Sequence, residues 1–207
     1  MSEDTKRVYR IEFDTRRYQS LSPADEHVFE SGQLRFDGTP KGEDWRPLAV
    51  RFVNPHLERP NIYYLASGCL VLDRRAIERF HDTLNWGCIE NAELLPLSVE
   101  GEEWQVVNVT ECINVLDSQK TVWKMEHGRR VAIEKYAFHM QRLGVTMPFS
   151  IPETADTEIL TLEITRQPLD EFKAAVEQAG LKGLKFTELW HGGRWQNARW
   201  EETADQP

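Results

Sequence analysis

The stretch Cys69-Leu70-Val71-Leu72-Asp73-Arg74-Arg75-Ala76-Ile77-Glu78-Arg79-Phe80 decides the fold, because it places a strand directly before a helix. The short apolar run at its start is typical of a buried strand. Asp73 can accept hydrogen bonds from the free amides of a helix start. Apolar residues then recur at helical spacing on one face, at Leu72, Ala76, Ile77, Phe80 and Leu84. With the apolar strand predicted at Leu94–Val99, this region forms a strand-helix-strand unit.

A second unit of the same kind is predicted near the other end of the chain. Thr157–Ile164 alternates like a half-buried strand, and Leu184–Leu189 returns as another. Between them, Leu169, Phe172, Val176 and Ala179 form the apolar stripe of a helix, with Pro168, Asp170 and Glu171 suited to its first turn. The two units could descend from a duplication. The alternative is that such units are common in any α+β protein.

The remaining chain is richer in strands and loops. Candidate strands between the two units are Trp104–Val109, Ile113–Leu116, Thr121–Met125 and Val131–Phe138, with a hairpin turn at Glu126–Arg129. Residues 1–60 are predicted to be loop-rich, with strands at Val8–Phe13 and Leu48–Val53.

These patterns predict an α+β fold. Its two strand-helix-strand units have their helices packed on a mixed or antiparallel sheet, and a β-rich segment lies between them. We expect a single domain over residues 1–190, or two packed lobes at about 1–118 and 119–190, followed by a partly flexible C-terminal tail at 191–207.

Composition restricts the class of protein and the compartment. The 207 residues hold 25 basic and 34 acidic side chains, a net charge of −9, which disfavours nucleic acid and anionic membranes as partners. The longest uncharged stretch, Pro60–Leu72, is shorter than the roughly 20 residues of a membrane-spanning helix. The charged segment Met1–Arg7 is unlike a signal peptide, and three cysteines do not suit a disulfide framework. We therefore expect a cytoplasmic protein.

No catalytic, cofactor or metal motif is found in the sequence. The six histidines and three cysteines lack the spacings of common zinc sites, and no phosphate-binding glycine pattern is present. Cys69 is better explained as a small apolar residue in a strand than as a nucleophile. The sequence therefore predicts no catalytic residue, no cofactor and no metal. One enzyme hypothesis stays open, in which His56, His81, Cys88 and His139 converge from separate segments.

The strongest electrostatic signal is the acidic window Phe80–Gln119. It contains no lysine or arginine, although forty residues of average composition would hold about five, and it holds eight acidic residues. Six basic residues follow between Lys120 and Arg142. Either the two segments exchange salt bridges, or the window docks a basic partner. In the second case the candidate contacts are Glu90, Glu93, Glu100, Glu102, Glu103, Glu111 and Trp104. Trp86 and Trp123 are further candidate anchors, with core packing as the alternative for each tryptophan.

Four stretches of the chain carry a resemblance to a known family. They are the early tryptophan–proline element Asp44–Pro47, the strand and helix Cys69–Phe80 with Glu93–Leu97, the segments Val106–Val109 and Val115–Ser118, and the glycine-containing stretch Ala179–Leu189. Over residues 44–190 their order resembles a bacterial family, first described as a domain of unknown function and later classed as the eleventh type of immunity protein of polymorphic toxin systems. The chain departs from it at Asp73, where serine is more frequent, and at Lys182, where threonine is usual.

The resemblance implies a small cytoplasmic protein that binds a cognate toxin and blocks it, with no catalytic residues to carry over. We therefore expect non-catalytic neutralisation of a toxin with a basic surface. The alternatives are a hydrolase-like enzyme and a homo-oligomeric scaffold that uses the aromatic tail Trp190–Trp200 as a contact.

Overall fold

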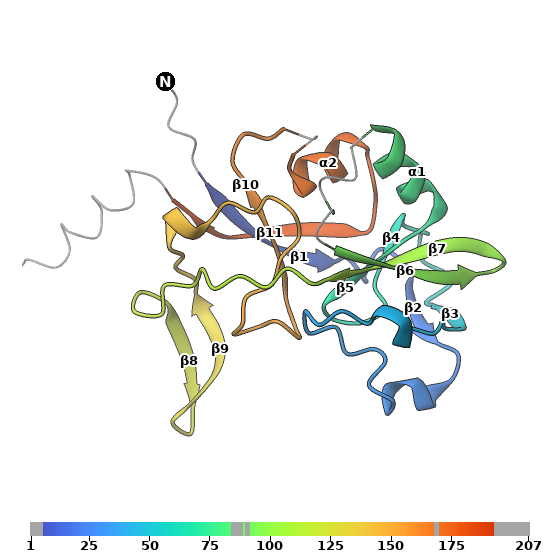
Figure 1. The fold of residues 1–207 in the computed structure, drawn as a ribbon, viewed down its shortest axis with the longest axis horizontal. Coiled ribbons are helices and arrows are strands. Elements are labelled where there is room, and N and C mark those ends of the chain that lie inside the picture. The colour runs from blue at the N-terminus through green and yellow to red at the C-terminus, as the bar shows by residue number, and fades with distance from the viewer. Residues whose placement is uncertain (1–5, 84–88, 90–91, 168–169, 193–207) are drawn as a thin grey trace, which may run out of the picture.

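The computed structural model describes residues 6–83, 89, 92–167 and 170–192, and strands make up most of the regular structure there (Figure 1). In chain order the elements are β1 (Arg7–Phe13), β2 (Ser20–Pro23), β3 (Val50–Val53), β4 (Ile62–Tyr63), β5 (Cys69–Leu72), α1 (Arg74–Thr83), β6 (Ala92–Val99), β7 (Glu102–Val109), β8 (Val122–Glu126), β9 (Arg129–Lys135), β10 (Ile159–Glu163), α2 (Phe172–Gln178) and β11 (Leu184–His191). This mixture of two α-helices and eleven strands within the described residues agrees with the expected α+β class.

Both predicted strand-helix-strand units are present, and each is split by a strand from elsewhere in the chain. One sheet has the order β10-β1-β11, and the other has the order β4-β5-β7-β6. All neighbours in these sheets pair antiparallel, so β10 runs parallel to β11, and β5 runs parallel to β6. In each case a helix connects two parallel strands that flank one antiparallel strand, which is the split β-α-β arrangement. We call them the β1 sheet and the β7 sheet after their inserted strands.

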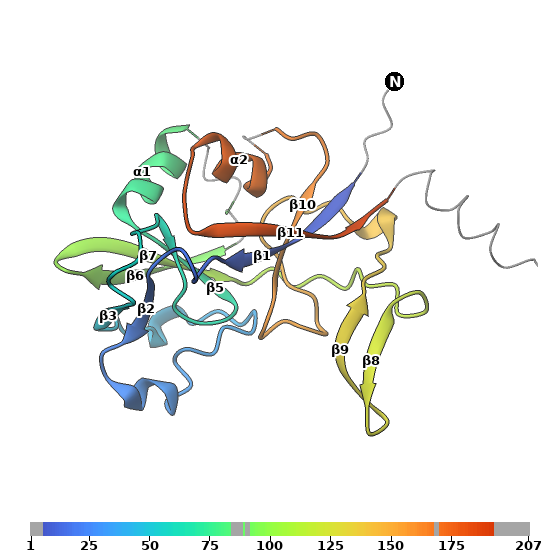
Figure 2. The same cartoon turned by 180° about the vertical axis from the view of Figure 1, so that it is seen from behind.

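The two helices lie side by side over the sheets and share one hydrophobic core (Figures 1 and 2). Phe80 of α1 stacks on Phe172 of α2, with ring centroids 5.9 Å apart. Ile11 of β1 and Leu70 of β5 contribute to the same cluster, so the core joins the β1 sheet to the β7 sheet. The apolar stripes that predicted the helices therefore face one common interior.

The opposite face of each sheet is covered by irregular chain. Over the β7 sheet, Phe36 and Trp45 from the N-terminal loops pack on Val71 and Val106. Over the β1 sheet, Phe138, Phe149 and other residues of the central segment pack on Val8 and Leu160. Loop-rich chain thus replaces a second helix layer on both sheets.

Local details confirm some expectations and correct others. Asp73 caps α1 as predicted, because its carboxylate accepts a 2.7 Å hydrogen bond from the Ala76 amide. The predicted strand Ile113–Leu116 is wrong: this segment contains only an isolated bridge from Leu116 to Phe138. In the loop-rich N-terminal part, β3 confirms the strand predicted at Leu48–Val53, whereas its partner β2 was missed.

The last turn predicted for the first helix, from Leu84 to Gly87, the first residues predicted for the second, 168–169, and the tail from residue 193 lie outside the described residues. The second helix begins at Phe172, so Asp170 and Glu171 precede its first turn and do not lie in it as predicted. Within the described part of the chain, no helix is long and apolar enough to cross a membrane.

Candidate functional site

Three of the eight acidic residues of the window lie at the turn between β6 and β7. Val99 pairs with Glu102, so Glu100 and Gly101 form a two-residue loop, and both have positive φ, 53° and 84°. These angles define a type I′ turn, whose twist matches that of the strands. Glu100, Glu102 and Glu103 are all exposed there, and we call them the acidic tip.

The base of the acidic tip is anchored in the core by Trp104. This side chain is only 5% exposed, and its ring lies 4.8 Å from that of Tyr63. Its indole nitrogen donates a 3.2 Å hydrogen bond to the Glu102 carboxylate. Trp104 is therefore a core residue, the alternative that the sequence left open beside a surface anchor, because β7 turns it away from solvent.

Glu93 has a structural role at the far end of β6. Its carboxylate accepts hydrogen bonds from the Lys41 and Gly42 amides and from the Asn108 side chain, at 2.6–2.8 Å. Burial raises the pKa of Glu93, but these hydrogen bonds outweigh burial and leave it below its ordinary value. The carboxylate therefore holds the N-terminal loop on the β7 sheet.

The acidic window does not form one face. Glu93 and Glu100 lie at opposite ends of β6, roughly 23 Å apart at about 3.3 Å per residue. Glu111 lies beyond β7, where its carbonyl accepts a hydrogen bond from the Ser150 amide. Glu90 and the candidate anchor Trp86 fall outside the described residues. Of the predicted contact residues that the structure describes, only those of the acidic tip form a compact exposed group.

The basic segment after the window forms a second hairpin, β8–β9, which projects from the body (Figure 1). Glu126 pairs with Arg129 across a loop of His127 and Gly128, both with positive φ, so this is again a type I′ turn. The hairpin turn was predicted correctly at these residues. Trp123 and Ile133 root the hairpin against the core, while nearly all its other residues are exposed.

The enzyme hypothesis gains little from the geometry. Burial raises the pKa of the Cys69 thiol to about 12, which keeps it protonated. His139 lies 3.9 Å from Asp117 and Cys88 is outside the described residues. Among the described residues, no three His, Cys, Asp or Glu side chains are grouped to hold a metal ion.

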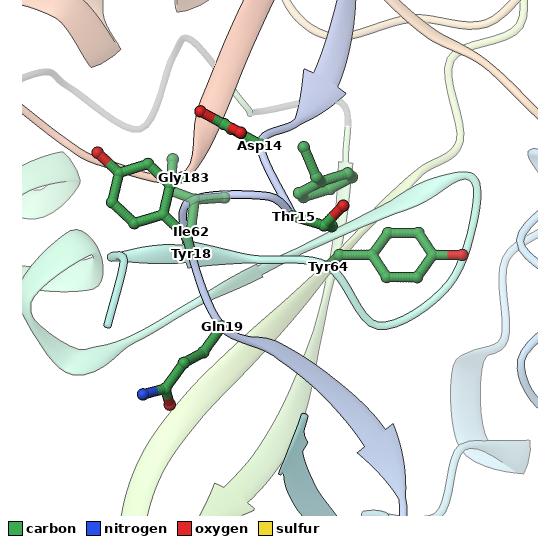
Figure 3. A pocket seen from close by; sticks show the side chains of 8 residues that line it. Asp14, Thr15, Tyr18, Gln19, Ile62, Tyr64 and Gly183 are labelled. Atoms are coloured by element: carbon green, nitrogen blue, oxygen red, sulfur yellow. The ribbon is translucent and has the colours of Figure 1, made fainter. Parts of the chain in front are cut away.

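Two hollows lie beside the C-terminal end of β1. The one in Figure 3, whose lining includes Tyr18, Tyr64 and Gly183, leaves no room for a water molecule. The other is a groove of about 350 Å³. At its rim, the Arg10 guanidinium pairs with the Glu158 carboxylate at 2.7 Å, so its charge is compensated within the chain.

A buried ionic cluster at the end of the β1 sheet was missed by sequence reasoning. Glu163 of β10 is 3% exposed and pairs with Lys173 of α2 at 2.9 Å and with Arg166 at 3.2 Å. Burial raises the pKa of Glu163, but these two cations lower it below the ordinary value. Alternation along Thr157–Ile164 places Glu163 on the side opposite Leu160, Leu162 and Ile164, so nothing in the pattern signals its burial. The cluster ties α2 to its sheet.

Comparison with known proteins adds no relative: no family model and no curated protein matches this chain.

Proposed function

We propose that this chain is an immunity-type protein that binds a toxin in the cytoplasm and neutralises it by occlusion, without catalysis of its own. The observation that carries the proposal is the acidic tip, three exposed glutamates at the type I′ turn and the start of β7. The order of motifs over residues 44–190 supports the same class of protein.

The geometry of the tip suits recognition of a basic protein surface. Its charge is displayed at one end of the molecule, and Trp104 fixes its base in the core, so little conformational freedom is lost on binding. Charges presented in this way accelerate association and select for a partner of opposite charge. The net charge of −9 disfavours nucleic acid and membrane as alternative partners.

The test is co-expression with the protein encoded by the neighbouring gene. We expect that protein to arrest growth alone and to be neutralised by this chain. The variant Glu100→Lys/Glu103→Lys spares the bond between Glu102 and Trp104 and should weaken binding at least tenfold, as measured by calorimetry. The matched control is Glu26→Lys/Glu30→Lys, the same charge change at side chains that are 86% exposed. A harmless neighbour, or toxicity that persists, contradicts the proposal.

A further inference from the structure

We propose that the β8–β9 hairpin is a docking arm that binds the acidic tip of a second copy of this chain, so that copies associate head to tail. This goes beyond the proposed function, although it uses the same acidic tip. The inference rests on the apolar exposure, the free edges, the charge and the position of the hairpin.

Exposed apolar side chains concentrate on the hairpin. Val122, Met125 and Val131 are 46%, 54% and 49% exposed, and they are three of the six large apolar side chains exposed in the described part of the chain. These three side chains lie on two strands that together hold only twelve residues of the chain. Such clustering is typical of an interaction surface.

The hairpin is also a sheet of only two strands. Within the described residues β8 pairs only with β9, so each strand leaves its outer edge unpaired. An isolated two-stranded sheet is marginally stable in water, and unpaired edges attract further chain. A contact that covers the hairpin would stabilise it.

The charge of the hairpin indicates which kind of surface binds to it. Residues 120–135 hold five basic and two acidic side chains, a net charge of +3 on a chain whose total is −9. The Arg129 guanidinium has no ion-pair partner among the described residues, and Arg130 lies over the Trp123 ring at 4.9 Å. Like charges disfavour pairing with the hairpin of another copy. The occupant must therefore bring negative charge.

The acidic tip supplies that charge. Glu100 pairs with Arg59 at 3.3 Å, which leaves Glu102 and Glu103 as exposed carboxylates beside it. The β6–β7 turn and the β8–β9 hairpin lie at opposite ends of the molecule in both views (Figures 1 and 2). The acidic tip and the β8–β9 hairpin of one molecule therefore cannot bind each other. A repeated contact of this heterologous kind extends into a chain of copies unless its rotation closes a ring.

The first experiment is sedimentation of the intact protein over a range of concentrations. At low ionic strength we expect the mean mass to rise with concentration from 24.1 kDa to beyond twice that value. At about 0.5 M salt the Debye length is only a few ångströms, so the charges are screened and the mean mass should return to that of the monomer. A monomer at every concentration and ionic strength overturns the proposal.

A charge swap identifies the two surfaces. Glu100→Lys/Glu103→Lys and Arg129→Glu/Arg130→Glu should each be monomeric, and an equimolar mixture of the two should associate again. Arg16→Glu/Arg17→Glu is the matched control, because Arg17 also lies over an aromatic ring, that of Tyr18. Unchanged melting temperatures show that the variants fold.

Association that survives either variant, or a mixture that stays monomeric, refutes the contact. Hairpin-dependent binding to a 20-base-pair DNA duplex, by a protein that stays monomeric, would assign the hairpin to nucleic acid instead. Neither result depends on the neighbouring gene, so the proposed function is tested separately.

Discussion

The carboxylate of Glu171 should be one of the most stabilising side chains in the protein. It is 1% exposed and stands directly before α2. Glu171 is the N-cap residue of α2, but its side chain makes no hydrogen bond to the first turn of the helix. Its Oε1 accepts from the Ile164 amide at 3.1 Å and from the Thr165 amide and hydroxyl at 2.6 and 2.9 Å, and its Oε2 accepts from the Arg166 amide at 3.0 Å. One side chain therefore satisfies the donors of the bend that follows β10.

The structure allows the cost of removing it to be estimated. Glu171→Ala leaves three backbone amides without their acceptor, at about 1–3 kcal/mol for each that stays buried. Thr165 and Arg166 are exposed, so water can reach part of the bend, and we expect a total loss of about 4 kcal/mol. Glu171→Gln keeps an oxygen for the donors at Oε1 and loses the bond from Arg166, which should cost about 1–2 kcal/mol.

Thermal unfolding followed by circular dichroism measures both losses. For a chain of this size about 4 kcal/mol lowers the melting temperature by roughly 8–16 °C. Glu177→Ala is the control on the same helix, because its side chain is 57% exposed and pairs with Lys173, and it should cost below about 1 kcal/mol. If Glu171→Ala melts at the same temperature as Glu177→Ala, the reasoning is refuted.

Two further predictions concern strain and pH. At Gly68, with φ of 81°, an added Cβ would lie 2.0 Å from the Phe36 carbonyl oxygen. Gly68→Ala should therefore cost about 3 kcal/mol or more, whereas Gly128→Ala, with open space, should cost about 1–2 kcal/mol; equal losses in urea unfolding would contradict this. The pKa of Glu163 is lowered when folded, so its stabilisation is complete above the ordinary value of 4.5 and is lost as pH falls through the folded pKa. Glu163→Gln should be less stable at pH 7, by a margin that shrinks towards pH 3; a margin that is constant with pH would argue against it.

The elements that could be predicted from the sequence are those specified by adjacent residues. Helix α1 follows from Asp73 and from the spacing of Ala76 and Phe80, and the β8–β9 turn follows from His127 and Gly128. The segment Ile113–Leu116 misled the prediction because Val115 and Leu116 are buried, at 2% and 3%, without a strand ladder beside them. Burial alone thus produced a strand pattern.

The candidate site was predicted only in part, for a similar reason. Charge counting identifies an acidic window, but it does not say on which side of a strand each residue falls. Alternation along β7 leaves Glu103 in solvent and Trp104 in the core. The role of Glu93 depends on Lys41 and Gly42, whose approach is fixed by tertiary packing alone. Glu163 likewise needs α2 to bring Lys173 to it.

The insertion of β1 between β10 and β11 has a consequence for the order of folding. Arg7 is paired with Glu163 on one side and with His191 on the other, so β1 is synthesised first but finds both neighbours last. The β7 sheet draws all its strands from residues 62–109 and can assemble while the rest is still being made. Since distant pairings slow folding, closure of the β1 sheet should be the late and rate-limiting event. Until then β1 remains unpaired on the nascent chain with Val8, Tyr9 and Ile11 uncovered, so a ribosome stalled before residue 159 would leave it open to aggregation.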